Sequence, residues 1–147
     1  MALHRVRERL SHLFPEVKES DLSGRTIVVV EDEASVLEGM RVLLEGWGAE
    51  VVFGTSIAET MEHVAPLSRA PDLIIADYGL REGAVGTHAI TAIRDRFKSV
   101  IPAIVITGSS LPAHLEDAKS VGAHLLIKPV MPGKLRTLIN FKLHQAA

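Results

Sequence analysis

The sequence predicts a doubly wound α/β domain built on one five-stranded parallel sheet. Two observations predict it: short runs rich in Val, Ile and Leu, and helix-like stretches that separate these runs. Short apolar runs are typical of parallel strands that are buried on both faces. Repeated strand–helix–strand units imply right-handed crossovers, which place helices on both faces of the sheet. We therefore expect strands over residues 27–30, 50–53, 72–76, 102–106 and 124–127.

The stretches between the strands have helical periodicity and end at helix-stop signals. Gly48 and Gly122 stand where a left-handed residue ends a helix, and Pro66 ends another. We expect helices over residues 34–47, 56–65, 87–97, 112–121 and 132–144. The first of these helices has an apolar side that we expect to face the sheet. That side consists of Val36, Met40, Leu43, Leu44 and Trp47.

The first 24 residues stand apart from this alternating pattern. Residues 1–14 predict an amphipathic helix, Pro15 indicates its end, and residues 16–24 are a polar connector. The helix carries an apolar stripe of Leu3, Val6, Leu10 and Leu13. We therefore predict two parts, an N-terminal helix with its connector over residues 1–24 and the α/β domain over residues 25–147. An apolar stripe of this kind packs against the α/β domain itself, a second copy of the chain or a partner protein, and we favour support of a homodimer.

Composition narrows the class of protein. The chain has 147 residues, 47% of them hydrophobic and 23% charged, which is ordinary for one globular domain. Its net charge of -2 provides no field that would attract nucleic acid or an anionic membrane. There is no cysteine, which excludes disulfides and thiol catalysis. With no signal peptide and no apolar run of transmembrane length, we expect a soluble cytoplasmic protein.

Complementary polar groups follow four of the predicted strands. Glu31 and Asp32 follow the first, Asp77 the third, Thr107 the fourth and Lys128 the fifth. In an open α/β sheet, ligands bind outside the carboxyl ends of the strands, so these side chains are expected to converge at one edge. A helix cap or a solvated loop residue explains any one of them taken alone. The coincidence of all of them favours a functional site.

The chemistry of these groups suits a divalent cation and a phosphoryl group. Mg²⁺ prefers oxygen ligands, and Glu31, Asp32 and Asp77 would supply carboxylates. An aspartate also acts as a nucleophile that forms an aspartyl phosphate. Thr107 offers a hydroxyl donor and Lys128 a compact positive charge. Phosphoryl transfer depends mainly on such positioning and charge stabilisation.

These residues carry a resemblance to a known family. Residues 30–33 (Val-Glu-Asp-Glu), 76–78 (Ala-Asp-Tyr), 106–108 (Ile-Thr-Gly) and 128–129 (Lys-Pro) stand in the order of its motifs. Over about residues 25–144, the chain resembles the receiver domain of two-component response regulators, which has a flavodoxin-like fold. The loop after Asp77 looks most like that of receivers associated with hybrid histidine kinases.

The resemblance implies a role for each site residue. Asp77 would be the phosphoacceptor, served by a sensor histidine kinase or a phosphotransfer protein. Thr107 and Lys128 would contact the phosphoryl group. Mg²⁺ would be held by Glu31, Asp32, Asp77 and the backbone carbonyl of Gly79. The resemblance also implies a cis peptide before Pro129 and a dimer face formed by the last two helices and the fifth strand.

Two positions depart from the family pattern. Many receivers carry an aromatic residue three positions before the lysine, where this chain has Leu125. Gly79 has no side chain beside the phosphorylation site, so we expect water to reach the acyl phosphate and shorten its life.

These features together predict a stand-alone response regulator that signals by changed protein contacts or by onward phosphotransfer. It would catalyse no reaction beyond its own aspartyl phosphorylation and dephosphorylation. The main alternative is a pseudo-receiver, an interaction module that is never phosphorylated. A haloacid-dehalogenase-type phosphatase requires a second aspartate where Gly79 stands. A flavodoxin-type flavin binder requires a phosphate loop where the acidic residues 31–33 stand.

Overall fold

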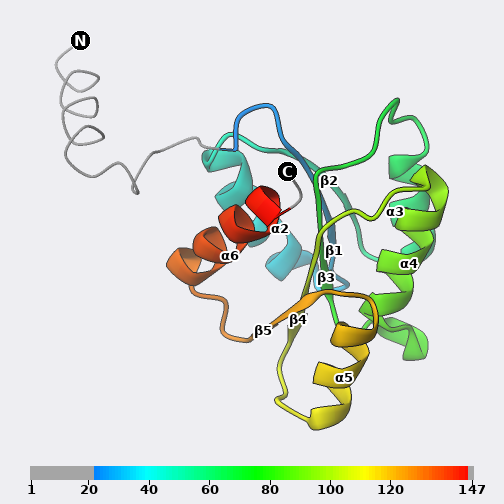
Figure 1. The fold of residues 1–147 in the computed structure, drawn as a ribbon, viewed down its shortest axis with the longest axis vertical. Helices are drawn as coiled ribbons and strands as arrows, with labels where there is room; N and C mark the ends of the chain where they lie inside the picture. The colour runs from blue at the N-terminus through cyan, green and yellow to red at the C-terminus, as the bar shows by residue number, and fades with distance from the viewer. Residues whose placement is uncertain (1–21, 146–147) are drawn as a thin grey trace, which may run out of the picture.

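The computed structural model describes residues 22–145, and this part of the chain folds around one parallel sheet (Figure 1). The sheet has five strands in the order β2-β1-β3-β4-β5. Its strands are β1 (Thr26–Val30), β2 (Glu50–Gly54), β3 (Leu73–Asp77), β4 (Ala103–Thr107) and β5 (His124–Ile127). The predicted helix over residues 1–14 lies outside the described residues.

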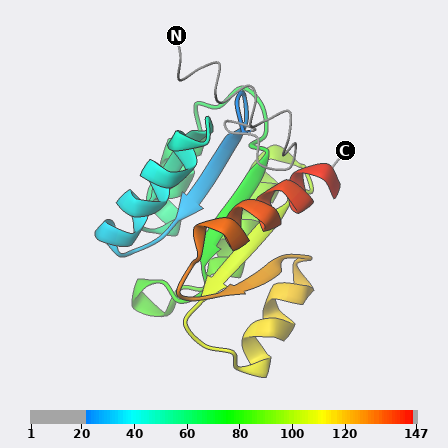
Figure 2. The same ribbon diagram turned by 90° about the vertical axis from the view of Figure 1, so that its left-hand side faces the viewer.

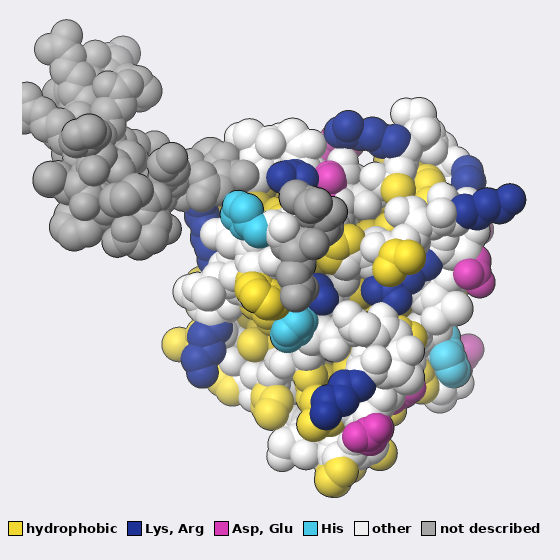
Figure 3. Space-filling model, viewed as in Figure 1, with side chains coloured by type: hydrophobic (Ala, Val, Ile, Leu, Met, Phe, Trp, Pro, Cys, Tyr) yellow, Lys and Arg dark blue, Asp and Glu magenta, His cyan; other side chains and the backbone are white. Residues whose placement is uncertain are grey.

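Helices connect the strands and cover both faces of the sheet, which confirms the predicted doubly wound fold. They are α2 (Ala34–Gly46), α3 (Ile57–Val64), α4 (Gly86–Phe97), α5 (Pro112–Ser120) and α6 (Pro132–Gln145). Figures 1 and 2 show α2 and α6 on one face and α3, α4 and α5 on the other. On the surface seen in Figure 3, Lys and Arg side chains are dispersed among hydrophobic and neutral groups.

Alternate residues of each central strand enter one of two cores, because side chains in a strand point to opposite faces. In β1, Ile27 and Val29 face α2 and α6, whereas Val28 and Val30 face α3 and α4. All five residues of β3 and of β4 are buried. Burial on both faces explains why the sequence of these strands is continuously apolar.

The apolar side of α2 differs from the predicted one at a single position, where Leu37 takes the place of Val36. Leu37, Met40 and Leu44 are buried against the sheet, and Val36 is 37% exposed. Two apolar stripes overlap on this helix, and both have helical spacing. The sheet takes the stripe centred on Met40, which turns Val36 towards solvent. Leu43 and Trp47 pack at the margin of the core.

Two further local features differ from the sequence expectations. Strands β3 and β4 continue one residue further than predicted, to Asp77 and Thr107, because Asp77 still pairs with Ile106 in the ladder. The predicted loop after β3 contains the short 3-10 helix η2 (Arg81–Gly83), in which Glu82 adopts a left-handed conformation with φ 63°.

Candidate functional site

The predicted site residues lie at the carboxyl edge of the sheet, beside its topological switch point. From β1 the chain crosses to β2 on one side of β1, and β3 then starts the other half of the sheet. Ligands of doubly wound proteins bind in the crevice at such a point. Glu31 follows β1 directly, Asp77 ends β3, and Lys128 follows β5.

Three carboxylates meet in this crevice. One oxygen from each of Glu31, Asp32 and Asp77 lies within 4.8 Å of the other two. Glu31 and Asp77 are buried, and Asp32 is half-buried. The Glu31 side chain is fixed by the backbone N–H of Glu33, which donates to Glu31 Oε1 at 3.1 Å. The three acidic residues thus converge, as the sequence predicts.

Burial disfavours the ionised carboxylates in this crevice. It raises the pKa of Glu31 to about 7, opposed by the hydrogen bond from Glu33 and reinforced by the charge of Asp77. Burial also raises the pKa of Asp77, against the opposing charge of Lys128. Carboxylates whose ionised forms are disfavoured in this way gain from a bound cation.

Lys128 is the cationic partner of the site. Its Nζ atom lies 3.3 Å from Asp77 Oδ1. Burial lowers the pKa of Lys128, but the charges of Asp77 and Glu31 outweigh that effect and the pKa is raised overall. The Lys128 backbone N–H donates to the Thr107 carbonyl at 2.7 Å, and the Lys128–Pro129 peptide is cis, as the resemblance implies.

The segment after Asp77 turns back on itself. Gly79 pairs with Val85 in an antiparallel bridge, and the Gly86 N–H donates to the Tyr78 carbonyl at 2.8 Å. A Cβ atom built on Gly86 would lie 3.0 Å from the carbonyl carbon of Asp77 and closer still to its oxygen. The first turn of α4 therefore packs directly on the backbone of Asp77, which only glycine allows.

Thr107 ends β4 with its side chain buried. Its Oγ1 atom accepts the Ser109 backbone N–H at 3.2 Å and lies 3.1 Å from Nδ1 of His114. The predicted hydroxyl donor therefore stands at the sheet edge, and in this structure its partner is a histidine on α5.

Several groups that surround the predicted site were not predicted from the sequence. The ring of His114 stacks on that of Tyr78, with centroids 3.9 Å apart and planes at 28°. Arg81 places Nε 3.7 Å from Asp32 Oδ2, although its side chain is largely exposed. The available signals were the position of Tyr78 beside Asp77 and of His114 at the start of the helix that follows Thr107.

Comparison with known proteins assigns the family. The family model of the response regulator receiver domain matches residues 27–140. The chain belongs to the response regulator receiver family. Curated relatives include the phyllosphere-induced regulator PhyR of Methylorubrum extorquens, 28% identical over 114 residues, which cover 78% of this chain and 42% of PhyR. The KDP operon transcriptional regulatory protein KdpE of Escherichia coli is 33% identical over 121 residues, 81% of this chain and 51% of KdpE.

The chain spans about half the length of these curated relatives. Among solved structures, a receiver domain from Clostridium thermocellum superimposes with a TM-score of 0.73 at 25% identity, covering 83% of this chain and 96% of that one. The receiver domain of a signal transduction histidine kinase from Syntrophus aciditrophicus gives 0.69 at 25% identity, covering 83% and 92%. None of the helices within residues 22–145 is long and apolar enough to span a membrane.

Proposed function

We propose that Asp77 accepts a phosphoryl group from a phosphohistidine of a sensor histidine kinase or phosphotransfer protein. The observation that supports this most strongly is the position of the buried Asp77 carboxylate, with Lys128 Nζ at 3.3 Å and the carboxylates of Glu31 and Asp32 beside it. Membership of the receiver family supports the same reaction.

In the proposed reaction a carboxylate oxygen of Asp77 bonds to phosphorus while the phosphorus–nitrogen bond of the phosphohistidine breaks. The electron pair of that bond leaves on the imidazole nitrogen, and an acyl phosphate remains on Asp77. Lys128 neutralises charge on the phosphoryl oxygens as the transfer proceeds. Thr107 donates its hydroxyl hydrogen to a phosphoryl oxygen of the product.

The donor set fits Mg²⁺, which we propose as the cofactor. Carboxylates of Glu31, Asp32 and Asp77 are grouped within ligand distance of one another, and the Gly79 carbonyl follows two residues after Asp77. When bound, Mg²⁺ would neutralise phosphoryl charge and orient the transferring group. The raised pKa of Glu31 and of Asp77 supports this proposal, because a bound cation would favour their ionised forms.

Mg²⁺ affinity should fall as the pH falls. The pKa of Glu31 is about 7 in the metal-free site, so protons compete with the cation for its carboxylate below that value. We expect the Mg²⁺ affinity to be about tenfold weaker at one pH unit below this pKa than at one unit above it. Isothermal calorimetry at the two pH values measures the change. Glu31→Gln should bind Mg²⁺ weakly and lose most of this pH dependence, whereas equal wild-type affinities at both pH values would contradict the assignment.

The aspartyl phosphate should be short-lived because Gly79 leaves the site open. A Cβ atom at Gly79 meets nothing within 4 Å, so a larger side chain fits there and would shield the acyl phosphate from water. We expect Gly79→Leu to lengthen the phosphate lifetime several-fold in a time course of intact mass after removal of the donor. An aspartyl phosphate that lasts many hours in the wild type, with a half-life unchanged by Gly79→Leu, would contradict this prediction.

We propose protein contacts as the output and a homodimer as the assembly. Large hydrophobic side chains are exposed on α5, β5, α6 and their connections, where a second copy could pack. They are Leu111, Leu115, Ile127, Met131 and Phe141. Support of the dimer by residues 1–20 is tested by deleting them, since an unchanged number of protomers per particle in solution contradicts it. That the protein acts as a stand-alone regulator and that the chain divides at residue 24 remain predictions. We propose no enzymatic activity beyond phosphorylation and dephosphorylation of Asp77.

Intact-protein mass after incubation with phosphoramidate and Mg²⁺ tests the proposed function, because phosphoramidate presents the same phosphorus–nitrogen bond as phosphohistidine. We expect one added phosphoryl group, which is absent without Mg²⁺ and absent from Asp77→Asn. No adduct under any of these conditions, together with no binding of beryllofluoride, would instead support a pseudo-receiver.

A further inference from the structure

The hydroxyl of Thr107 has only one hydrogen to donate. Its oxygen accepts the N–H of Ser109, and its hydrogen can be donated to Nδ1 of His114 at 3.1 Å when that histidine is the neutral Nε2–H tautomer. The proposed function gives the same hydrogen to a phosphoryl oxygen on Asp77. The bond from Thr107 to His114 and the bond to the phosphoryl group are therefore mutually exclusive.

His114 is joined to a wider set of contacts between α5 and the phosphorylation site. Its ring stacks on Tyr78, the residue after Asp77. Burial and a hydrogen bond to Asp117, also on α5, raise the pKa of the Tyr78 hydroxyl. Asp117 Oδ2 in turn accepts the Thr87 hydroxyl of α4 at 3.1 Å. Helix α5 is therefore held to β4, to α4 and to the residue that follows β3 by polar and ring contacts.

Within residues 22–145, few apolar contacts hold α5. Of its nine residues, from Pro112 to Ser120, only Ala118 is buried. No side chain caps its N-terminus, and the large side chains of Leu111 and Leu115 are exposed. Buried apolar area provides most of the energy that keeps a helix in place, so α5 depends unusually on its polar contacts.

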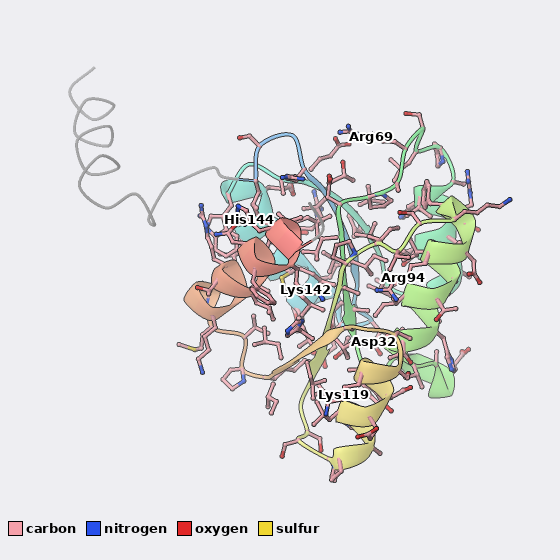
Figure 4. All side chains as sticks on the ribbon, in the orientation of Figure 1. Asp32, Arg69, Arg94, Lys119, Lys142 and His144 are labelled. Atoms are coloured by element: carbon pink, nitrogen blue, oxygen red, sulfur yellow. The ribbon has the colours of Figure 1, made fainter. Side chains whose placement is uncertain are left out.

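The C-terminal end of α5 is held by two cations. The Arg94 guanidinium of α4 donates to the Val121 carbonyl, and Lys142 Nζ of α6 donates to the Gly122 carbonyl at 3.3 Å. Figure 4 shows Arg94 and Lys142 approaching from the two sides of the sheet. Cations at a helix C-terminus satisfy its free carbonyls and its dipole. This end of α5 is therefore fixed independently of the phosphorylation site.

We propose that His114 is a positioning residue that couples the state of Thr107 to the placement of α5. While Asp77 is unmodified, the Thr107–His114 bond holds the N-terminal end of α5. Phosphorylation withdraws the hydroxyl hydrogen and so loosens that end, which keeps its ring contact with Tyr78, while Arg94 and Lys142 hold the other. This inference rests on the proposed function, since it assigns the conformational response of the same site.

The side chain at position 125 supports coupling through His114. Leu125 is half-buried and packs in the core beneath α3, α4 and α5. It has neither an aromatic ring nor a polar atom that would respond to a change at Thr107. The ring that does contact Thr107 is that of His114, which stacks on Tyr78.

Amide hydrogen exchange of α5 tests the proposal on the full chain in two states. In the unmodified state, we expect His114→Ala to speed exchange of the α5 amides about five- to tenfold, the effect of losing one hydrogen bond and a ring contact. His114→Phe keeps a ring on Tyr78 but not the bond to Thr107, and should give an intermediate increase. His88→Ala removes an exposed histidine of α4 and should leave α5 unchanged.

In the second state, beryllofluoride and Mg²⁺ stand in for the phosphoryl group. Wild-type α5 should then exchange nearly as fast as in unmodified His114→Phe, because both lack the bond to Thr107 and keep a ring on Tyr78, and His114→Ala should respond little to the mimic. Equal α5 exchange in unmodified wild type and His114→Ala contradicts the proposal. So does a wild type that takes up phosphoryl groups by mass yet shows no response in α5. Failure of phosphorylation itself counts against the proposed function and leaves the comparison in the unmodified state decisive for His114.

Discussion

Lys128→Gln should slow phosphoryl uptake by about 100-fold or more, which is the usual effect of losing one preorganised donor to a developing charge. Lys128 Nζ lies 3.3 Å from Asp77 Oδ1 and is the cation that accompanies the nucleophile. Its loss also removes an influence that lowers the pKa of Asp77, so that pKa would rise further. A smaller fraction of Asp77 would then be ionised at neutral pH. Both effects act in the same direction.

The measurement for Lys128→Gln is the rate of mass increase with phosphoramidate and Mg²⁺. Lys134→Gln is the matched control, because Lys134 is an exposed lysine of α6 and the same charge is removed. We expect the control to react at the wild-type rate. A Lys128→Gln protein that reacts as fast as this control shows that Lys128 has no part in the transfer.

Gly86→Ala should lower the free energy of unfolding by about 1–3 kcal/mol, the usual cost of forcing a methyl group into a packed site. The new Cβ atom would lie 3.0 Å from the Asp77 carbonyl carbon and 3.3 Å from Ala76 Cβ. The atoms nearest to it belong to the backbone, so no rotamer change relieves the contact. Either α4 or the end of β3 must shift, and a shift of β3 displaces the phosphoacceptor. We therefore expect slower phosphoryl uptake as well.

Gly39→Ala makes the same chemical change in α2, where a Cβ atom meets nothing within 4 Å. It should raise the free energy of unfolding by about 0.5–1 kcal/mol, because alanine is the better helix former. Urea unfolding of the two variants should therefore give changes of opposite sign. A Gly86→Ala protein as stable and as reactive as wild type contradicts the close packing of α4 on Asp77.

The sheet and the acidic cluster could be predicted because both follow from local rules. Continuous apolar runs identify buried parallel strands, and the carboxyl ends of such strands share one edge. Glu31, Asp32 and Asp77 therefore had to approach one another once the strands were recognised. The Lys128–Asp77 contact follows in the same way, although its 3.3 Å separation depends on the loop that begins at Lys128.

Features set by helix rotation and by loop conformation could not be predicted in this way. Val36 and Leu37 belong to two overlapping stripes of α2, and only packing against the sheet selects between them. The contact of His114 with Thr107 depends on where α5 starts after the intervening loop, which sequence spacing leaves open. Glu82 adopts a left-handed conformation in which glycine is usual, so its sequence position gave no signal.

The central claim is that Asp77, among all carboxylates of the chain, receives the phosphoryl group. Reduction with borohydride after treatment with phosphoramidate and Mg²⁺ converts an aspartyl phosphate to homoserine, which peptide mass mapping then locates. We expect homoserine at position 77 and unmodified aspartate at Asp32. Reduction at any other carboxylate, or a phosphoryl group found on a histidine with Asp77 intact, would contradict it.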